Sequence, residues 1–90
     1  MEDFSIIYKG TLTAQDITLF ENQKGCIVKN LMIYNTQAQS IQVNLSFDDV
    51  LFIIELQTNE FKKIDILPFT QKIVANGDSV NIHISGLVIS

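Results

Sequence analysis

The sequence of 90 residues contains no arginine; six lysines supply its basic groups, and ten residues are acidic. Guanidinium is the group best suited to hold phosphate through two parallel hydrogen bonds, so that mode of recognition is excluded. The formal net charge of −4 also disfavours nucleic acids and anionic membrane surfaces, which attract a basic protein face. The composition therefore predicts neither a nucleic-acid partner nor a membrane partner.

Cysteines and long apolar runs are also scarce. Cys26 is the single cysteine, so no disulfide can form within the chain. The longest apolar run, residues 50–54, is far shorter than the roughly 20 residues of a membrane-spanning helix. The chain starts with acidic residues, whereas a secretory signal peptide starts with basic ones. We expect a soluble, unprocessed protein that assembles in a reducing cytoplasm.

Residues typical of catalytic or metal sites are few and isolated. His83 is the single histidine, and its phase places it on the polar face of a strand, which indicates a surface residue. Cys26 has two lysines nearby in sequence, but its place beside a turn favours a small apolar residue at the start of a strand. Asp48 and Asp49 could form a carboxylate pair or calcium ligands, although adjacent acids are typical of tight turns. No glycine-rich phosphate loop, zinc-ligand cluster or nucleophile motif is present. The sequence predicts no catalytic, cofactor-binding or metal site, and hence no enzyme.

The clearest pattern that is present is a hairpin over residues 41–56. Apolar and polar residues alternate without interruption from Ile41 to Asp48, which is the period of a strand with one solvated face. A more apolar segment follows the two aspartates. A turn at the aspartates places eight apolar side chains on one face, in the pairs Phe47/Val50, Leu45/Phe52, Val43/Ile54 and Ile41/Leu56. A shift of one residue would expose half of them, so this register is strongly specified. We expect this face to form the core with Val80, Ile82 and Ile84.

Further short strands are predicted on both sides of the hairpin. They cover residues 4–12, 16–21, 26–35, 64–66, 80–85 and 87–89. Turns are predicted at residues 22–25 and at Asn76-Gly77-Asp78, and Pro68 is expected to end the strand before it. Bulges are expected at Gly10 and at Lys29-Asn30. No segment has helical periodicity. The sequence therefore predicts one all-β domain over residues 1–90, a single antiparallel β-sandwich of jelly-roll type with about seven to nine short strands.

Some apolar residues fall on faces whose other residues are polar. On the second face of the hairpin, Leu51 is predicted to oppose Ser46 and Ile53 to oppose Asn44. The residues that are out of phase in this way are Ile7, Leu51, Ile53, Leu87 and Ile89. Large contiguous apolar patches are uncommon on monomers, so this set is a candidate oligomer or partner interface. The alternative is that other parts of the same chain cover these side chains.

The order of strands and turns resembles that of a known class of proteins. A turn, a β-branched strand and a closing asparagine occupy residues 25–35, an alternating strand occupies residues 41–47, and a Gly-Asp turn with a strand occupies residues 76–82. With Ile84-Ser85-Gly86 near the end, this order is similar to that of small all-β virion structural proteins of tailed bacteriophages, of the capsid decoration, neck or collar, tail, or fibre-base type. Residues 48–49 and 58–60 lack the glycine expected in this class, and residues 87–90 are more apolar than its usual acidic ending.

The resemblance implies a function without catalysis. It implies a structural component of a bacteriophage virion that self-associates as a homo-oligomer and docks on other virion proteins, after assembly in the host cytoplasm. The alternative is a glycan- or receptor-binding β-sandwich module on the particle surface, with Tyr34 and polar loop groups forming a shallow site. Carbohydrate sites usually use aromatic platforms, and this chain has no tryptophan and two tyrosines.

Overall fold

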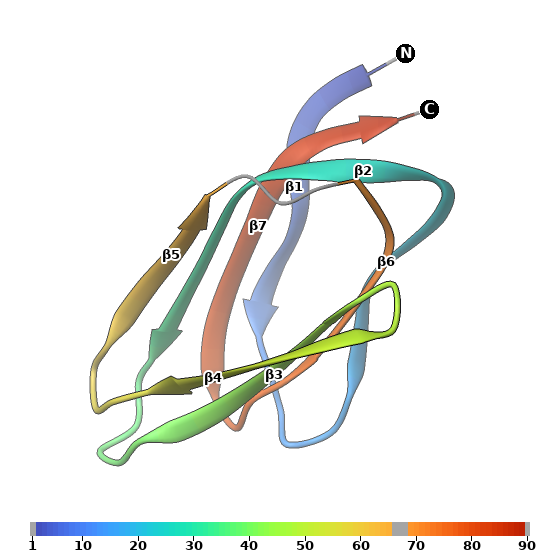
Figure 1. Cartoon of the computed structure of the whole chain (residues 1–90). Coiled ribbons are helices and arrows are strands. Elements are labelled where there is room, and N and C mark those ends of the chain that lie inside the picture. The colour runs from blue at the N-terminus through green and yellow to red at the C-terminus, as the bar shows by residue number, and fades with distance from the viewer. Residues whose placement is uncertain (1, 66–68, 90) are drawn as a thin grey trace.

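In the computed structural model the chain forms seven strands and no helix over the described residues, 2–65 and 69–89, with side chains described from residue 5 (Figure 1). The strands are β1 (Glu2–Thr11), β2 (Ile17–Asn35), β3 (Ile41–Phe47), β4 (Val50–Leu56), β5 (Phe61–Asp65), β6 (Thr70–Asn76) and β7 (Val80–Ile89). The prediction of an all-β antiparallel fold is confirmed. The predicted strand end at Ile66 and Pro68 lies outside the described residues.

All seven strands belong to one open sheet. Its order is β1-β7-β2-β6-β3-β4, and β5 pairs with a second stretch of β2. The sheet curls, so that the β3–β4 hairpin crosses in front of β7 (Figure 1). One cluster of buried residues joins the two curled halves, with Val43 and Leu45 of β3 together with Ile82 and Ile84 of β7. The predicted sandwich of two separate sheets, and its jelly-roll order, are therefore not confirmed, because a continuous sheet encloses the core.

The long strand β2 makes this curling possible. Residues 17–26 pair with β6, whereas residues 26–35 pair with β7, and Cys26 pairs with both Thr70 and Val88. Between the two stretches the register shifts, and Gly25 takes a φ of 81°, a conformation that favours glycine. The prediction of a turn at residues 22–25 between two strands is wrong, because the chain bends there without leaving the sheet.

Two bulges shift the register of strand pairing, one in the edge strand β1 and one in β2 at the centre of the sheet. The predicted bulge at Lys29-Asn30 is confirmed, since the register shifts between Val28 and Asn30. Gly86 faces this bulge, and a Cβ atom at that position would lie 3.0 Å from Val28 Cα and 2.9 Å from the Lys29 backbone nitrogen. In β1 the shift falls between Ile6 and Tyr8 rather than at the predicted Gly10.

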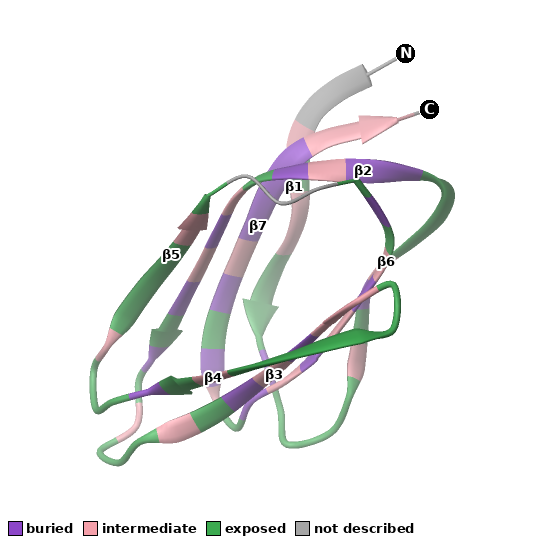
Figure 2. Ribbon diagram, in the orientation of Figure 1, coloured by how far each residue is buried: buried purple, intermediate pink, exposed green. Residues whose placement is uncertain are grey.

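The predicted register of the β3–β4 hairpin is confirmed at every pair, from Phe47/Val50 to Ile41/Leu56. Burial along the hairpin is uneven (Figure 2). Val43, Leu45 and Leu56 are fully buried, as are the predicted core residues of β7. However, Val50 is 56% exposed and Phe52 is 51% exposed. The prediction that all eight side chains lie in the core is wrong at these two positions, because β4 is the last strand of its half of the sheet and has a neighbour among the described strands on one side only.

Candidate functional site

The tip of the β3–β4 hairpin is a two-residue turn in which Asp48 and Asp49 both have positive φ values, 52° and 69°. Glycine or asparagine is usual at such positions. Here the Asp48 carboxylate accepts hydrogen bonds from the backbone N–H groups of Gln71 and Lys72, each at 2.9 Å, and its own N–H donates to the Lys72 carbonyl at 2.9 Å. These bonds, the one from Gln71 first, lower the pKa of Asp48 from its usual value of 3.8. The turn-former interpretation of the two aspartates is confirmed.

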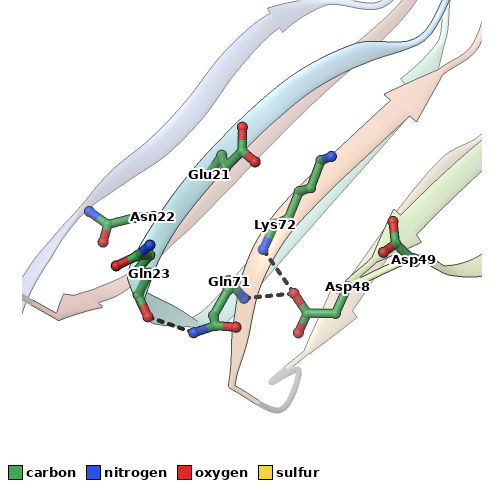
Figure 3. A pocket seen from close by; sticks show the side chains of 7 residues that line it. All are labelled: Glu21, Asn22, Gln23, Asp48, Asp49, Gln71 and Lys72. Carbon is green, nitrogen blue, oxygen red and sulfur yellow. Dashed lines mark hydrogen bonds between the residues drawn. The ribbon is translucent and has the colours of Figure 1, made fainter.

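A polar groove of about 400 Å³ lies beside this turn (Figure 3). Its lining residues are Glu21, Asn22, Gln23, Asp48, Asp49, Gln71 and Lys72. The Gln71 side chain donates to the Gln23 carbonyl at 2.6 Å, so the groove joins the bend of β2 to β6. The described residues include no group of three or more histidine, cysteine or acidic side chains placed to hold a metal ion. The polar contacts of this groove serve to hold the hairpin against β6.

The most unusual surface of the molecule is the open edge of β4. Four consecutive apolar residues are more than half exposed, namely Val50, Leu51, Phe52 and Ile53, at 56%, 55%, 51% and 61%. Figure 2 shows this exposure along most of the strand. In a two-residue hairpin the residues flanking the turn form a hydrogen-bonded pair, and such pairs then alternate along the strands. The N–H and C=O groups of Leu51, Ile53 and Glu55 therefore point away from β3, where no described strand pairs with them. Edges of this kind normally have a lysine, a proline or a bulge, and β4 has none of these.

An apolar groove of about 240 Å³ adjoins the inner face of β4. It is lined by Leu45, Phe47, Phe52, Ile53 and Ile54 of the hairpin and by Ile64 of β5. The rings of Phe47 and Phe52 lie 5.9 Å apart at 58°, a tilted arrangement that favours aromatic contact. The groove therefore separates the free edge of β4 from β5, where the curled sheet is open.

On the outer face of the hairpin, Leu51 and Ile53 border polar residues, as the sequence predicts. Gln42 donates to Asn44, Asn44 to Asn76, and Asn76 to Asp16, at 3.1, 2.9 and 2.6 Å. This row of side-chain bonds crosses β3 and β6 to the residue before β2. These polar side chains are hydrogen-bonded to one another, whereas the adjacent apolar pair, Leu51 and Ile53, is exposed to solvent.

The other three predicted interface residues lie elsewhere. The bulge in β1 turns Ile7 toward the core and leaves Ile6 53% exposed. Ile7, which the alternation places on the polar side of its strand, is therefore partly buried against the core of the same chain. Leu87 and Ile89 are half-buried in β7, where they pair with β1, so this tail is already part of the sheet. The structure brings Leu51 and Ile53 together and places Ile7, Leu87 and Ile89 on strands that do not pair with β4.

A buried asparagine that the residue patterns did not single out fixes the position of β4 relative to β5. Asn35 is fully buried at the end of β2. Its Nδ2 donates to the carbonyls of Gln39, Leu56 and Gln57 at 2.8, 3.2 and 3.0 Å, and its Oδ1 accepts from the Gln37 N–H at 2.8 Å. The only sequence signal was its place at the end of a strand before a polar loop. Asn35 holds the end of β4 where the chain turns toward β5.

The remaining candidate residues have separate environments. Cys26 is fully buried, and burial first and the charge of Asp48 second raise the pKa of its thiol from 9.0 to about 11. His83 and Asn81 line a shallow groove of about 200 Å³ with Tyr34 and Phe61, which are paired residues of β2 and β5. His83 is half-buried, and its Nδ1 has no hydrogen-bond partner among the described residues.

Comparison of the chain with protein-family models found no match, and comparison with curated proteins found none either. Within the described part of the chain there is no helix long and apolar enough to cross a membrane.

Proposed function

We propose that this protein is a non-enzymatic structural subunit that associates with copies of itself and docks on other proteins of a larger particle. The observation that supports this most directly is the open edge of β4, where four apolar side chains are more than half exposed and two of them, Phe52 and Ile53, line an apolar groove. At about 100 Å² for each half-exposed large side chain, the four residues expose about 400 Å², divided between the inner face (Val50 and Phe52) and the outer face (Leu51 and Ile53) of the edge strand.

Burial of these four side chains would favour association. Burying a large apolar side chain completely contributes about 1.5–3 kcal/mol, and these side chains are already about half buried. The four residues together therefore offer about 3–6 kcal/mol for each chain that contributes them. The loss of translational and rotational freedom on association offsets part of this free energy. The expected contact is therefore of moderate strength, which suits assembly of many copies.

The particle we propose is a bacteriophage virion, and the support for it is the resemblance of residues 25–35, 41–47 and 76–86 to small all-β virion proteins. In such a particle a subunit with an unpaired edge pairs with its neighbours instead of remaining free in solution. The position we propose is a capsid, neck or tail component assembled in the host cytoplasm.

The test is the double change Leu51→Ser and Ile53→Ser, followed by light scattering and circular dichroism. The matched control is Ile6→Ser with Phe61→Ser, which removes two apolar side chains of similar exposure, 53% and 55%, from β1 and β5. We expect the first variant to lose the oligomer with its strand signal intact and the control to keep it. A wild-type chain that stays monomeric at about 100 µM would contradict the proposal, as would equal loss of the oligomer in both variants.

A second candidate function is glycan or receptor binding by the shallow groove at Tyr34. Tyr34 and Phe61 are 38% and 55% exposed and form adjacent aromatic surfaces, with Asn81 and His83 as neighbouring polar groups. A monomeric chain that binds a sugar, and loses that binding in Tyr34→Ala but not in Leu51→Ser, would favour this function over the first.

A further inference from the structure

We propose that β4 pairs antiparallel with β4 of a second copy, about a two-fold axis through Phe52, so that two curled sheets join into one. This inference rests on the proposed self-association and adds the strand, the register and the symmetry of the contact. The second copy is the partner because the exposed part of β4 is complementary to itself.

The register follows from the geometry of the strands. A two-fold axis perpendicular to the sheet keeps the same face of both strands on one side. Opposite residues must therefore point to the same face, so their numbers differ by an even number, and the axis lies midway between the two copies of one residue. With the axis at Phe52, Val50 opposes Ile54, Leu51 opposes Ile53, and Phe52 opposes its own copy. Every one of these pairs is apolar on apolar. The free backbone groups of Leu51 and Ile53 then bond to each other across the axis, which satisfies the unpaired part of the edge.

A second register, with the axis at Ile53, would use the whole of β4 but fits less well. It opposes Leu51 to Glu55, an apolar side chain to a carboxylate. It also places Leu56, which is fully buried, opposite Val50 of the second copy. The pairing centred on Phe52 uses residues 50–54, of which only Ile54 is half-buried, and it leaves the buried Leu56 outside the contact.

The expected contact is weak for an isolated pair of chains. Even complete burial of the about 400 Å² that these residues expose on each chain would remove about 800 Å² in total, below the roughly 1,200 Å² of stable complexes. The register also places Asp49 of each copy opposite Glu55 of the other, and like charges directly opposite disfavour pairing. Added salt should therefore strengthen the dimer, and Glu55→Lys should lower its dissociation constant several-fold, because an attractive pair replaces the repulsive one.

Disulfide trapping tests the register directly. At a pair without hydrogen bonds across a two-fold axis the Cα atoms lie about 4.5 Å apart, within the range of a disulfide. We expect Phe52→Cys to form a covalent dimer under mild oxidation. Val50→Cys alone should not, since its own copy lies four residues away, about 13 Å along the strand. A mixture of Val50→Cys and Ile54→Cys should form the mixed dimer. The buried Cys26 makes the wild-type chain the background control.

The outcomes separate this inference from the proposed function. Covalent dimers of Phe52→Cys and of the Val50→Cys and Ile54→Cys mixture, with Phe61→Cys remaining monomeric, support it. The pairing is refuted if the wild type associates but Ile53→Cys, and not Phe52→Cys, forms the covalent dimer. It is also refuted if the wild type associates and neither variant forms a covalent dimer. In both cases the proposed self-association stands. If the wild type is monomeric and no variant is trapped, both proposals fail. Circular dichroism of each variant shows that the fold is retained.

Discussion

Replacement of Asn35 by alanine is the most informative test of how the fold sets the position of β4. The change removes four hydrogen bonds, three donated by Nδ2 to the carbonyls of Gln39, Leu56 and Gln57 and one accepted from the Gln37 N–H. Each such bond contributes about 0.5–1.5 kcal/mol net. Gln39 and Gln57 are exposed and can bond to water, whereas the Leu56 carbonyl belongs to a fully buried residue. We therefore expect the free energy of unfolding to fall by about 2–4 kcal/mol.

The assay is urea unfolding followed by circular dichroism. A domain of this size has a stability of about 5–14 kcal/mol, so the loss is a large fraction of the total. With a urea slope of about 2 kcal/mol/M, in the middle of the usual range, the midpoint should fall by about 1–2 M at an unchanged slope. Asn22→Ala is the matched control, because Asn22 is exposed and accepts a single bond, from the Lys24 N–H at 2.8 Å. A midpoint within about 0.3 M of the wild type for Asn35→Ala would refute the reasoning.

Three further predictions concern the core, the hairpin turn and the thiol. Leu45→Ala should cost about 2–5 kcal/mol because Leu45 is fully buried, and an unchanged urea midpoint would contradict its core position. Because the pKa of Asp48 is below 3.8 in the folded chain, its stabilisation is present above pH 3.8 and is lost as the pH falls through the lower folded value. The difference in unfolding free energy between wild type and Asp48→Asn should thus shrink below pH 3.8 in urea titrations at several pH values, and a difference independent of pH would argue against the carboxylate bonds. Since the pKa of Cys26 is raised to about 11, a thiol reagent at about pH 8 should label it in urea but not in the native state, and rapid native labelling would show that the site is open.

Much of the local structure could be predicted from the sequence. The pairs from Phe47/Val50 to Ile41/Leu56 and the bulge at Lys29-Asn30 follow from period-two alternation and its interruption. These features depend on neighbours within a few residues, or across one tight turn, so the local pattern contains the information that determines them. The apolar residues Leu51 and Ile53 were also identified in this way, from a mismatch with Asn44 and Ser46 across the same hairpin.

The sequence could not determine which strands become neighbours in the folded sheet. The alternation of β4 shows which side chains share a face, but the exposure of Val50 and Phe52 depends on β4 being the last strand of the curled sheet. The same holds for the bend in β2, which reads as a turn until β6 and β7 are seen to pair with its two halves. Asn35 acquires its role from carbonyls up to 22 residues away. Strand order and long-range bonds are set by how the whole chain buries its apolar surface, and only the tertiary structure shows that the outer edge of β4 has no partner among the described strands.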